Sequence, residues 1–318
     1  MFAVQFDRFG GPEVLHLGTA DAPWPRAGQI RVRVHAAGVS PVDVGLRSGR
    51  TPMSARLPLP HIPGVDAAGV VDEIGEGVDG VALGDHVFGV VDVAKLGGGT
   101  AQYAVLQLWA DKPAVMSWAQ AGAAGSSIET ATRALDLLGL QPGMTLLVDG
   151  AAGGVGSVAV QLAAARGVRV IGTARADNRD FLSQLGATPV TYGPDLADRV
   201  KALGVARVDR ALDVAGAGSL TQLLELVGDP SAVVTLADFT APAHGVRLSM
   251  GQLAGEPDGR HGLRAAAELF TEGRFTVPIE AAFPLEKATD AHETAEHGSR
   301  RGKIVMIVDG AQASSHQS

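Results

Sequence analysis

A cluster of glycines that follows a short apolar segment most constrains how this chain can fold. Residues 146–148 read Leu-Leu-Val, the continuously apolar pattern of a strand buried in a parallel sheet. The glycines come next, and residues 157–166 then read as a helix that Gly167 ends. An apolar segment at residues 168–171 indicates a second strand. Together these segments predict a β-α-β unit with glycines in its first turn.

Glycines in this context indicate a dinucleotide-binding turn. Because they lack Cβ atoms, the backbone amides between the strand and the helix can approach a pyrophosphate, which the helix dipole also attracts. Glycines of ordinary turns lack the flanking strand and helix. The residues expected to bind the cofactor at this turn are Gly150, Ala152, Gly153, Gly154, Val155 and Gly156.

The end of the second strand predicts which dinucleotide binds. An NAD site usually has Asp or Glu there, about 20 residues after the glycines, to accept hydrogen bonds from the ribose hydroxyls. This chain has Thr173-Ala174-Arg175 instead. A guanidinium attracts a 2′-phosphate and gives NAD no acidic partner, so we expect NADPH rather than NADH. Asn178 and Arg179 are further donors, although a solvated position at the start of the next helix explains Arg179 better.

Composition excludes several classes of function. The net charge of -8 opposes binding to nucleic acid or to anionic lipid, since both favour a basic surface. The 318 residues include no cysteine, so redox chemistry must come from a bound cofactor, and a zinc site that needs thiolates is excluded. The N-terminal residues do not resemble a leader, and no apolar run approaches the roughly 20 residues that span a bilayer. We therefore expect a soluble cytoplasmic protein that binds neither membrane nor nucleic acid.

The order of the patterns along the chain predicts two domains. Residues 1–110 show short strands and turns, which are typical of a compact β-rich unit. After Trp118, helices and strands alternate as in a doubly wound parallel sheet. The last segment returns to the earlier character. We expect an α/β fold with a β-rich domain at residues 1–122, a nucleotide-binding domain at residues 123–272 and a return to the first domain at residues 273–318.

Several blocks of sequence resemble the medium-chain dehydrogenases/reductases, in particular their zinc-independent, quinone-oxidoreductase (zeta-crystallin-like) branch. The resemblance covers nearly the whole chain. It implies a GroES-like catalytic domain, a Rossmann domain, a cleft between them where nicotinamide meets substrate, and a homodimer. The blocks are residues 35–43 (HAAGVSPVD), 62–71 (IPGVDAAGVV), 84–87 (GDHV), 149–156 (DGAAGGVG) and 301–305 (RGKIV).

The same resemblance argues against a metal. Zinc-dependent relatives carry Gly-His-Glu where this chain has Gly64-Val65-Asp66, and a ligating cysteine that has no counterpart here. Zinc-free members transfer hydride from the nicotinamide to a quinone or an α,β-unsaturated carbonyl. The protein then has to position two planar molecules, polarise the acceptor oxygen and exclude water. Because solvent can protonate the product, no protonic side chain is required.

The resemblance also implies site residues. Ser40, Thr130 and the loop residues Ala237, Asp238 and Phe239 would lie on the nicotinamide side. Thr130 matches a threonine that relatives place against the cofactor, although a helix hydroxyl bonded to its own backbone is an alternative.

Two tyrosines are further candidates. Tyr192 follows the third strand, as a tyrosine does near the adenosine phosphate of several NADPH-using relatives. An aromatic residue that simply ends the sheet explains Tyr192 equally well. Tyr103 is a candidate for contact with substrate, since it ends a block of small residues in the β-rich domain.

Two departures from the family leave the acceptor open. Relatives commonly have Asn where this chain has Ser40, a shorter side chain with different donor geometry. Many quinone reductases have a tyrosine where this chain has Val44-Gly45, which would enlarge or reshape the acceptor pocket. We expect NADPH-dependent reduction of a quinone or enone. The alternatives are a tailoring enoyl reductase of secondary metabolism with a bulky polycyclic substrate, and a nucleotide-binding sensor or cyclase without net redox turnover.

Overall fold

The structure, a computed structural model, describes residues 1–92, 95–298 and 301–308. The chain divides into two compact units, each of which is described by itself. The first unit comprises Met1–Ser126 together with the chain from Ile279 onward, and the second comprises Ser127–Pro278. The domain limits expected from the sequence, after residues 122 and 272, lie close to these boundaries.

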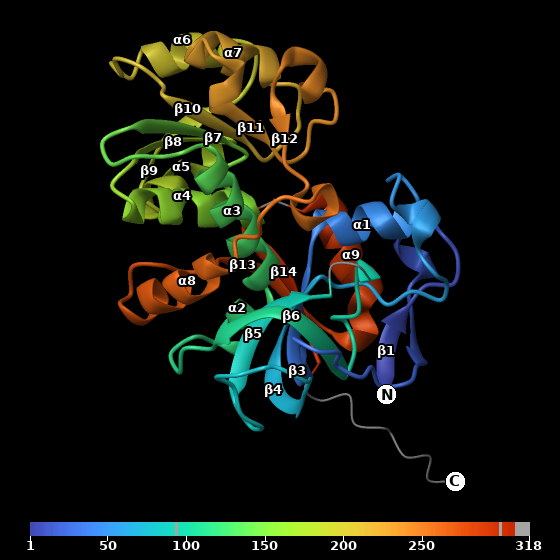
Figure 1. Cartoon of the computed structure of the whole chain (residues 1–318). Helices are drawn as coiled ribbons and strands as arrows, with labels where there is room; N and C mark the ends of the chain where they lie inside the picture. Colours follow the sequence, from blue (N-terminus) through green and yellow to red (C-terminus); the bar gives the residue numbers. More distant parts are fainter. Residues whose placement is uncertain (93–94, 299–300, 309–318) are drawn as a thin grey trace. The chain divides into compact units, whose positions relative to one another are not determined.

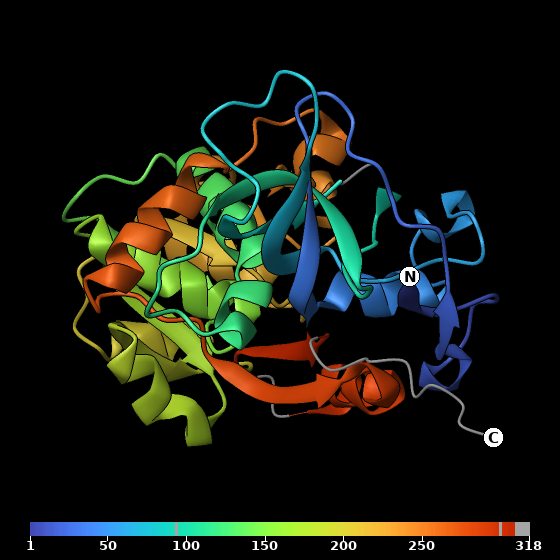
Figure 2. The same cartoon turned by 90° about the horizontal axis from the view of Figure 1, so that it is seen from below.

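The strands of the first unit pair mostly antiparallel (Figures 1 and 2). Four of them pair in sequence order, and because the last also pairs with the first, they close on themselves. These four are β3 (Ile30–Val39), β4 (Asp66–Ile74), β5 (His86–Val91) and β6 (Tyr103–Asp111). Closure of this kind removes the exposed strand edges that would otherwise invite pairing with other chains.

The C-terminal segment extends this sheet. β14 (Lys303–Ile307) pairs antiparallel with β3, and β13 (Ile279–Pro284) pairs parallel with β14. The chain therefore returns to the first unit after it has formed the second. The remaining elements of the first unit are the β1–β2 pair (Phe2–Gln5 and His16–Thr19) and the helices α1 (Pro41–Ser48), α2 (Trp118–Gly122) and α9 (Ala288–His297).

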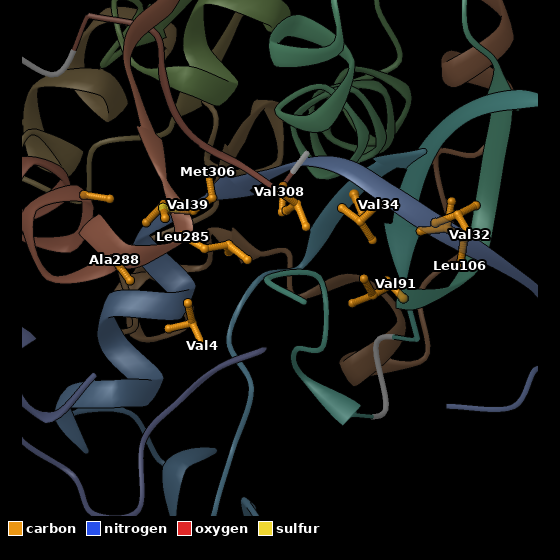
Figure 3. Close-up of a cluster of buried hydrophobic side chains, with 14 of the residues drawn as sticks. Val4, Val32, Val34, Val39, Val91, Leu106, Leu285, Ala288, Met306 and Val308 are labelled. Carbon is orange, nitrogen blue, oxygen red and sulfur yellow. The ribbon is translucent and has the colours of Figure 1, made fainter. Parts of the chain in front are cut away.

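The core of the first unit is aliphatic (Figure 3). On β3, the even-numbered residues Ile30, Val32 and Val34 are buried, and the strand's alternating pattern puts Arg33 on the exposed face. Arg31 departs from the pattern, because it is only 9% exposed. Side chains from the C-terminal segment enter the same core, notably Leu285, Ala288, Met306 and Val308.

The second unit contains a six-stranded sheet in which every recorded pair of strands is parallel. The order across the sheet is β12-β11-β10-β7-β8-β9, so the chain leaves β7 in one direction and later returns to its other side at β10. This arrangement confirms the expected doubly wound parallel sheet. Its strands are β7 (Thr145–Asp149), β8 (Arg169–Ala174), β9 (Ala187–Thr191), β10 (Arg210–Asp213), β11 (Val233–Thr235) and β12 (Arg247–Leu248).

Helices connect these strands. α4 follows the glycine turn, and eight consecutive residues from Gly156 to Ala163 are buried, which agrees with the apolar character of most of its residues. The helices are α3 (Gly125–Leu137), which begins in the first unit, α4 (Gly154–Ala165), α5 (Arg179–Gln184), α6 (Leu196–Lys201), α7 (Leu220–Val227) and α8 (His261–Thr271).

A buried charge joins α1 to α9 in the first unit. Arg47 on α1 is 0% exposed, and its guanidinium pairs with Glu296 on α9. His292, also on α9, is 1% exposed. Burial lowers the pKa of His292 to about 3, and the positive charge of Arg47 acts in the same direction. His292 is therefore neutral in the folded protein.

We expect His292 to make the folded state less stable as the pH falls from 6.5 toward about 3. In this window the unfolded histidine takes up a proton that the folded residue does not bind, so the unfolded state is favoured. Between pH 7 and pH 5 the wild type should lose ~2 kcal/mol more unfolding free energy than His292→Gln. Denaturant unfolding of both proteins at the two pH values measures this difference, and equal losses would contradict the prediction.

Candidate functional site

The glycine turn lies at the carboxyl end of β7, the strand at which the parallel sheet reverses its order. Gly150 has a φ of +81°, a conformation that side-chain-bearing residues rarely adopt. Gly153 caps α4, and a Cβ atom built there would meet only the Gly150 oxygen, at 3.5 Å. A Cβ atom at Gly156 would lie 2.2 Å from the same oxygen. Gly156 therefore lets α4 pack against the turn, whereas Gly153 leaves space beside it.

A buried carboxylate and two hydroxyls hold this turn in place. Asp149, the last residue of β7, accepts hydrogen bonds from Thr173 Oγ1 and Ser219 Oγ. Thr173 Oγ1 in turn accepts a hydrogen bond from the Gly150 amide at 3.0 Å. Asp149 and Thr173 are 2% and 1% exposed. The turn is thus fixed to the ends of both β7 and β8. Thr173, a candidate from the sequence, supports the turn from within the protein.

The ends of β10 and β11 carry a similar arrangement. Asp213 accepts hydrogen bonds from two amides of the following loop and from Thr235 Oγ1, the last at 2.8 Å. Burial raises the pKa of Asp213, although these hydrogen bonds oppose the shift. Thr235 Oγ1 also accepts from the amides of Ala237 and Asp238, at 3.2 and 3.0 Å. These contacts shape the loop that continues to Phe239.

The other cofactor candidates lie at the same edge, because they follow the carboxyl ends of neighbouring parallel strands. Arg175 follows β8 and is exposed, and its side chain has no hydrogen bond or ion pair with any residue that the structure describes. Asn178 is 6% exposed. Tyr192 follows β9 and is 54% exposed, and Phe239 is 60% exposed.

Thr130 has side-chain partners on its own helix. Its hydroxyl donates to Glu129 Oε2 at 3.1 Å and accepts from Arg133 Nη2 at 3.4 Å. Arg133 also donates from Nε to Glu129 at 3.0 Å. The hydroxyl is therefore held within a charged group on α3, and the backbone hydrogen bond considered as an alternative is replaced by these contacts.

Ser40 belongs to a buried cluster of polar and charged side chains in the first unit. Lys303 Nζ donates to Ser40 Oγ at 2.7 Å and to Asp66 Oδ2 at 3.0 Å. Asp66 also accepts from the Ser126 hydroxyl at 2.8 Å and from the Ser126 amide. Ser40 and Lys303 are each 5% exposed, and Asp66 is 0% exposed. A buried, hydrogen-bonded ion pair therefore lies against the candidate hydroxyl.

Asp43 fixes the backbone at Ser40. Its Oδ2 accepts from the Ser40 amide at 2.8 Å, and its Oδ1 accepts from the Gly64 amide at 2.9 Å. Burial raises the pKa of Asp43 to about 7, and the nearby Asp66 carboxylate adds to the rise while both amides oppose it. Ser40 is thus held at its amide by Asp43 and at its hydroxyl by Lys303.

The structure does not bring Tyr103 to Ser40. Tyr103 lies opposite Arg33 in the β3–β6 ladder, near the start of β3, whereas Ser40 follows the end of that strand. The Tyr103 ring is 5.3 Å from the guanidinium of Arg31, which also lies 4.9 Å from the ring of Trp24. Arg31 also pairs with Asp72, with Nη2 2.9 Å from Oδ2, and this ion pair together with the ring contacts accounts for its burial. The Tyr103 ring is thus engaged in a structural contact.

The space beside Gly45 is partly filled. A Cβ atom built at Gly45 would lie 2.8 Å from Thr51 Cγ2. The absence of a tyrosine after Val44 therefore does not by itself leave an opening, because the Thr51 methyl group occupies the adjoining position.

Lys303 and Asp66 were not among the residues that the sequence nominated for the site. Both stand in sequence blocks that resemble the family, residues 62–71 and 301–305. One signal was available: Lys303 opens an otherwise apolar strand, Lys-Ile-Val-Met-Ile, and a lysine in that position needs a buried anion.

Within residues 1–92, 95–298 and 301–308, no three His, Asp or Glu side chains are grouped so that they could hold a metal ion. In the same ranges, no helix has both the length and the apolar character needed to cross a membrane.

Comparisons with known proteins agree with this architecture. Residues 26–113 match the alcohol dehydrogenase GroES-like domain, and residues 185–306 match the zinc-binding dehydrogenase family. The chain is 32% identical to the quinone oxidoreductase of Sus scrofa, an alignment that spans 97% of this chain and 98% of that protein. This chain is a medium-chain dehydrogenase/reductase of the quinone oxidoreductase branch. The resemblance inferred from the sequence blocks is thereby confirmed.

Other similar proteins carry names that differ in the cofactor or the substrate that they state. The 2-methylene-furan-3-one reductase of Solanum lycopersicum is 31% identical over 96% of this chain and 79% of that protein. The Escherichia coli quinone oxidoreductase complexed with NADPH has a TM-score of 0.79 at 26% identity, over 97% of this chain and 100% of that one. An NAD-dependent alcohol dehydrogenase has a TM-score of 0.80 at 30% identity, with the same coverage.

We expect Gly153→Ala to weaken nucleotide binding without disturbing the fold. The added methyl group has room in the protein, where its nearest neighbour would be 3.5 Å away. It would, however, occupy the space that a pyrophosphate needs to approach the amides. The expected result is a rise of about tenfold or more in the Kd for NADPH, measured by calorimetric titration, with unfolding free energy within ~1 kcal/mol of wild type.

Gly156→Ala is the matched variant for this test. Its methyl group would lie 2.2 Å from a backbone oxygen, so the helix or the turn must shift. We expect a loss of roughly 1–3 kcal/mol of unfolding free energy. Unchanged NADPH affinity in a well-folded Gly153→Ala protein would refute the assignment of this turn to the pyrophosphate.

Proposed function

We propose that this protein is an NADPH-dependent oxidoreductase that transfers hydride to a quinone or an α,β-unsaturated carbonyl compound without using a metal. The observation that carries the proposal is an exposed Arg175 at the end of β8, beside a glycine turn with space at Gly153. An arginine without an acidic partner in this position favours a cofactor that carries a 2′-phosphate.

The carboxyl edge of the second unit suits such a cofactor. Amides around Gly153, at the start of α4, would hold the pyrophosphate, because a helix N-terminus favours an anion. Arg175 would bind the 2′-phosphate, and the exposed ring of Tyr192 is available to the adenosine. The loop Ala237–Phe239, held by Thr235, would lie at the nicotinamide side. When bound, the cofactor supplies the hydride.

The acceptor class rests on the relatives and on Ser40. The names of the similar proteins include quinone and a conjugated methylene ketone as acceptors. Both classes carry a carbonyl oxygen that gains negative charge on reduction, and a hydroxyl such as that of Ser40 can stabilise it. We also propose that the protein is a cytoplasmic homodimer. Sedimentation velocity would test the dimeric state.

An acceptor panel tests the reaction. Oxidation of NADPH is followed with simple quinones, simple enones and polycyclic enones, with NADH as the control cofactor. Turnover of a simple quinone or enone with a preference for NADPH is the expected result. Turnover confined to polycyclic enones would favour the tailoring enoyl reductase. Tight NADPH binding with no oxidation by any acceptor would favour a sensor or cyclase.

Arg175→Ala tests the cofactor preference. Loss of a charge-assisted hydrogen bond to the 2′-phosphate should weaken NADPH binding by roughly 1–3 kcal/mol and leave NADH binding almost unchanged. Titration of each cofactor into both proteins gives the two differences. Arg169→Ala is the matched control, because Arg169 is an exposed arginine at the start of β8, the opposite end of the strand from Arg175. Equal losses for NADPH and NADH would show that Arg175 does not bind the phosphate.

A further inference from the structure

We propose that Ser40 donates the proton to the reduced acceptor and that Lys303 positions and polarises the Ser40 hydroxyl. This inference rests on the proposed function, because it requires an acceptor that gains hydride. It goes further because it names a side chain, rather than solvent, as the source of the proton that the reduced acceptor takes up.

The direction of one hydrogen bond carries the inference. Lys303 Nζ lies 2.7 Å from Ser40 Oγ and 3.0 Å from Asp66 Oδ2. Lys303 forms an ion pair with the fully buried Asp66 carboxylate. An ammonium group has no lone pair, so Ser40 Oγ must be the acceptor. The hydroxyl proton of Ser40 then has no acceptor among the described residues, and it is available to a ligand oxygen.

The same contacts argue against a nucleophilic serine. A serine–lysine nucleophile needs a neutral amine that can take the hydroxyl proton. Here the second partner of Lys303 is an anion, and that anion is itself held by the amide and hydroxyl of Ser126. Lys303 is therefore a donor, and it makes the Ser40 hydroxyl a better acid rather than a better nucleophile.

Ser40 is also rigidly placed. Asp43 accepts from its amide at 2.8 Å, and Ser40 directly precedes α1 as the N-cap residue. Ser40 and Lys303 are each only 5% exposed. A donor that is already oriented in a poorly solvated position needs little rearrangement when charge develops on a nearby oxygen.

The proposed step balances in atoms and electrons. The acceptor takes up hydride and two electrons from the reduced nicotinamide, and negative charge develops on its carbonyl oxygen. The O–H bond of Ser40 breaks, and an O–H bond to the acceptor forms. Ser40 Oγ then regains a proton from Lys303 Nζ, and the resulting amine is reprotonated from solvent. A quinone leaves as the hydroquinone, and an enone leaves as the enol that becomes the saturated ketone.

Ser40→Ala is the first test, in single-turnover stopped-flow reactions of the NADPH-loaded protein with the acceptor that the wild type turns over. We expect the hydride-transfer rate to fall about 100-fold, the usual scale of general acid catalysis, with the Kd for NADPH unchanged. The solvent deuterium isotope effect on this step should disappear. Ser40→Thr keeps a hydroxyl and should recover most of the rate. Ser40→Ala at the wild-type rate would overturn the proposal.

Lys303 needs a variant that does not leave Asp66 as an unpaired buried charge. Lys303→Met with Asp66→Asn removes both charges together. We expect this double variant to fold and to lower the hydride-transfer rate at least tenfold. Combined with Ser40→Ala, it should cause no further loss of rate, because Lys303 acts through Ser40. Lys287→Met is the matched control, since Lys287 is 61% exposed and should leave the rate unchanged. Additive losses would overturn the role of Lys303.

Two outcomes separate this inference from the proposed function. A wild type that turns over no quinone or enone overturns the proposed function, and this assignment with it. A wild type that turns over while Ser40→Ala matches it overturns the inference alone. Covalent labelling of Ser40 by a fluorophosphonate would also overturn the inference, because it would show a nucleophilic hydroxyl.

Discussion

The burial of the Lys303 charge is the constraint on which the first unit depends. Lys303 opens β14, the strand that attaches the C-terminal segment to β3, so its ammonium enters the interior as the sheet forms. Leaving such a charge unpaired would cost roughly 3–5 kcal/mol. Asp66, at the start of β4, removes that cost, and the pair ties together parts of the chain that are 237 residues apart. The contact that completes the sheet therefore also orients Ser40.

The second unit buries charge by different means. Asp149 and Asp213 end the adjacent strands β7 and β10, and their hydrogen-bond donors are hydroxyls and backbone amides. Neutral donors satisfy the carboxylates and at the same time fix the loops that follow the strands. Within the part of the chain that the structure describes, no arginine donates to either carboxylate. The exposed Arg175 is consequently available to an anionic ligand, which is the feature that the cofactor preference requires.

Sequence patterns predicted those features of the fold that depend on residues close together in the chain. The strand, turn and helix around Gly150 were predictable, because burial and glycine geometry are encoded within about 20 residues of one another. The Lys303–Asp66 pair was not, since periodicity identifies buried positions without saying which distant charge meets which. Tyr103 illustrates the same limit: its ring is engaged by Arg31, a residue that the alternation on β3 assigns to the exposed face. Loop-filling contacts such as Thr51 against Gly45 likewise depend on tertiary packing.

Two buried groups on and beside the α1 helix, which Ser40 precedes, change the stability of the folded protein in opposite directions as the pH falls. His292, packed near Arg47, has a pKa lowered from 6.5 to about 3, so its contribution to stability falls as the pH decreases. Asp43 has a pKa raised from 3.8 to about 7, so the folded state binds more protons and gains stability as the pH decreases. Each slope approaches ~1.4 kcal/mol per pH unit, with opposite sign, where the two windows overlap. In the wild type the two groups together should therefore change the free energy of unfolding little as the pH falls. The effect of one group appears only in a protein that lacks the other.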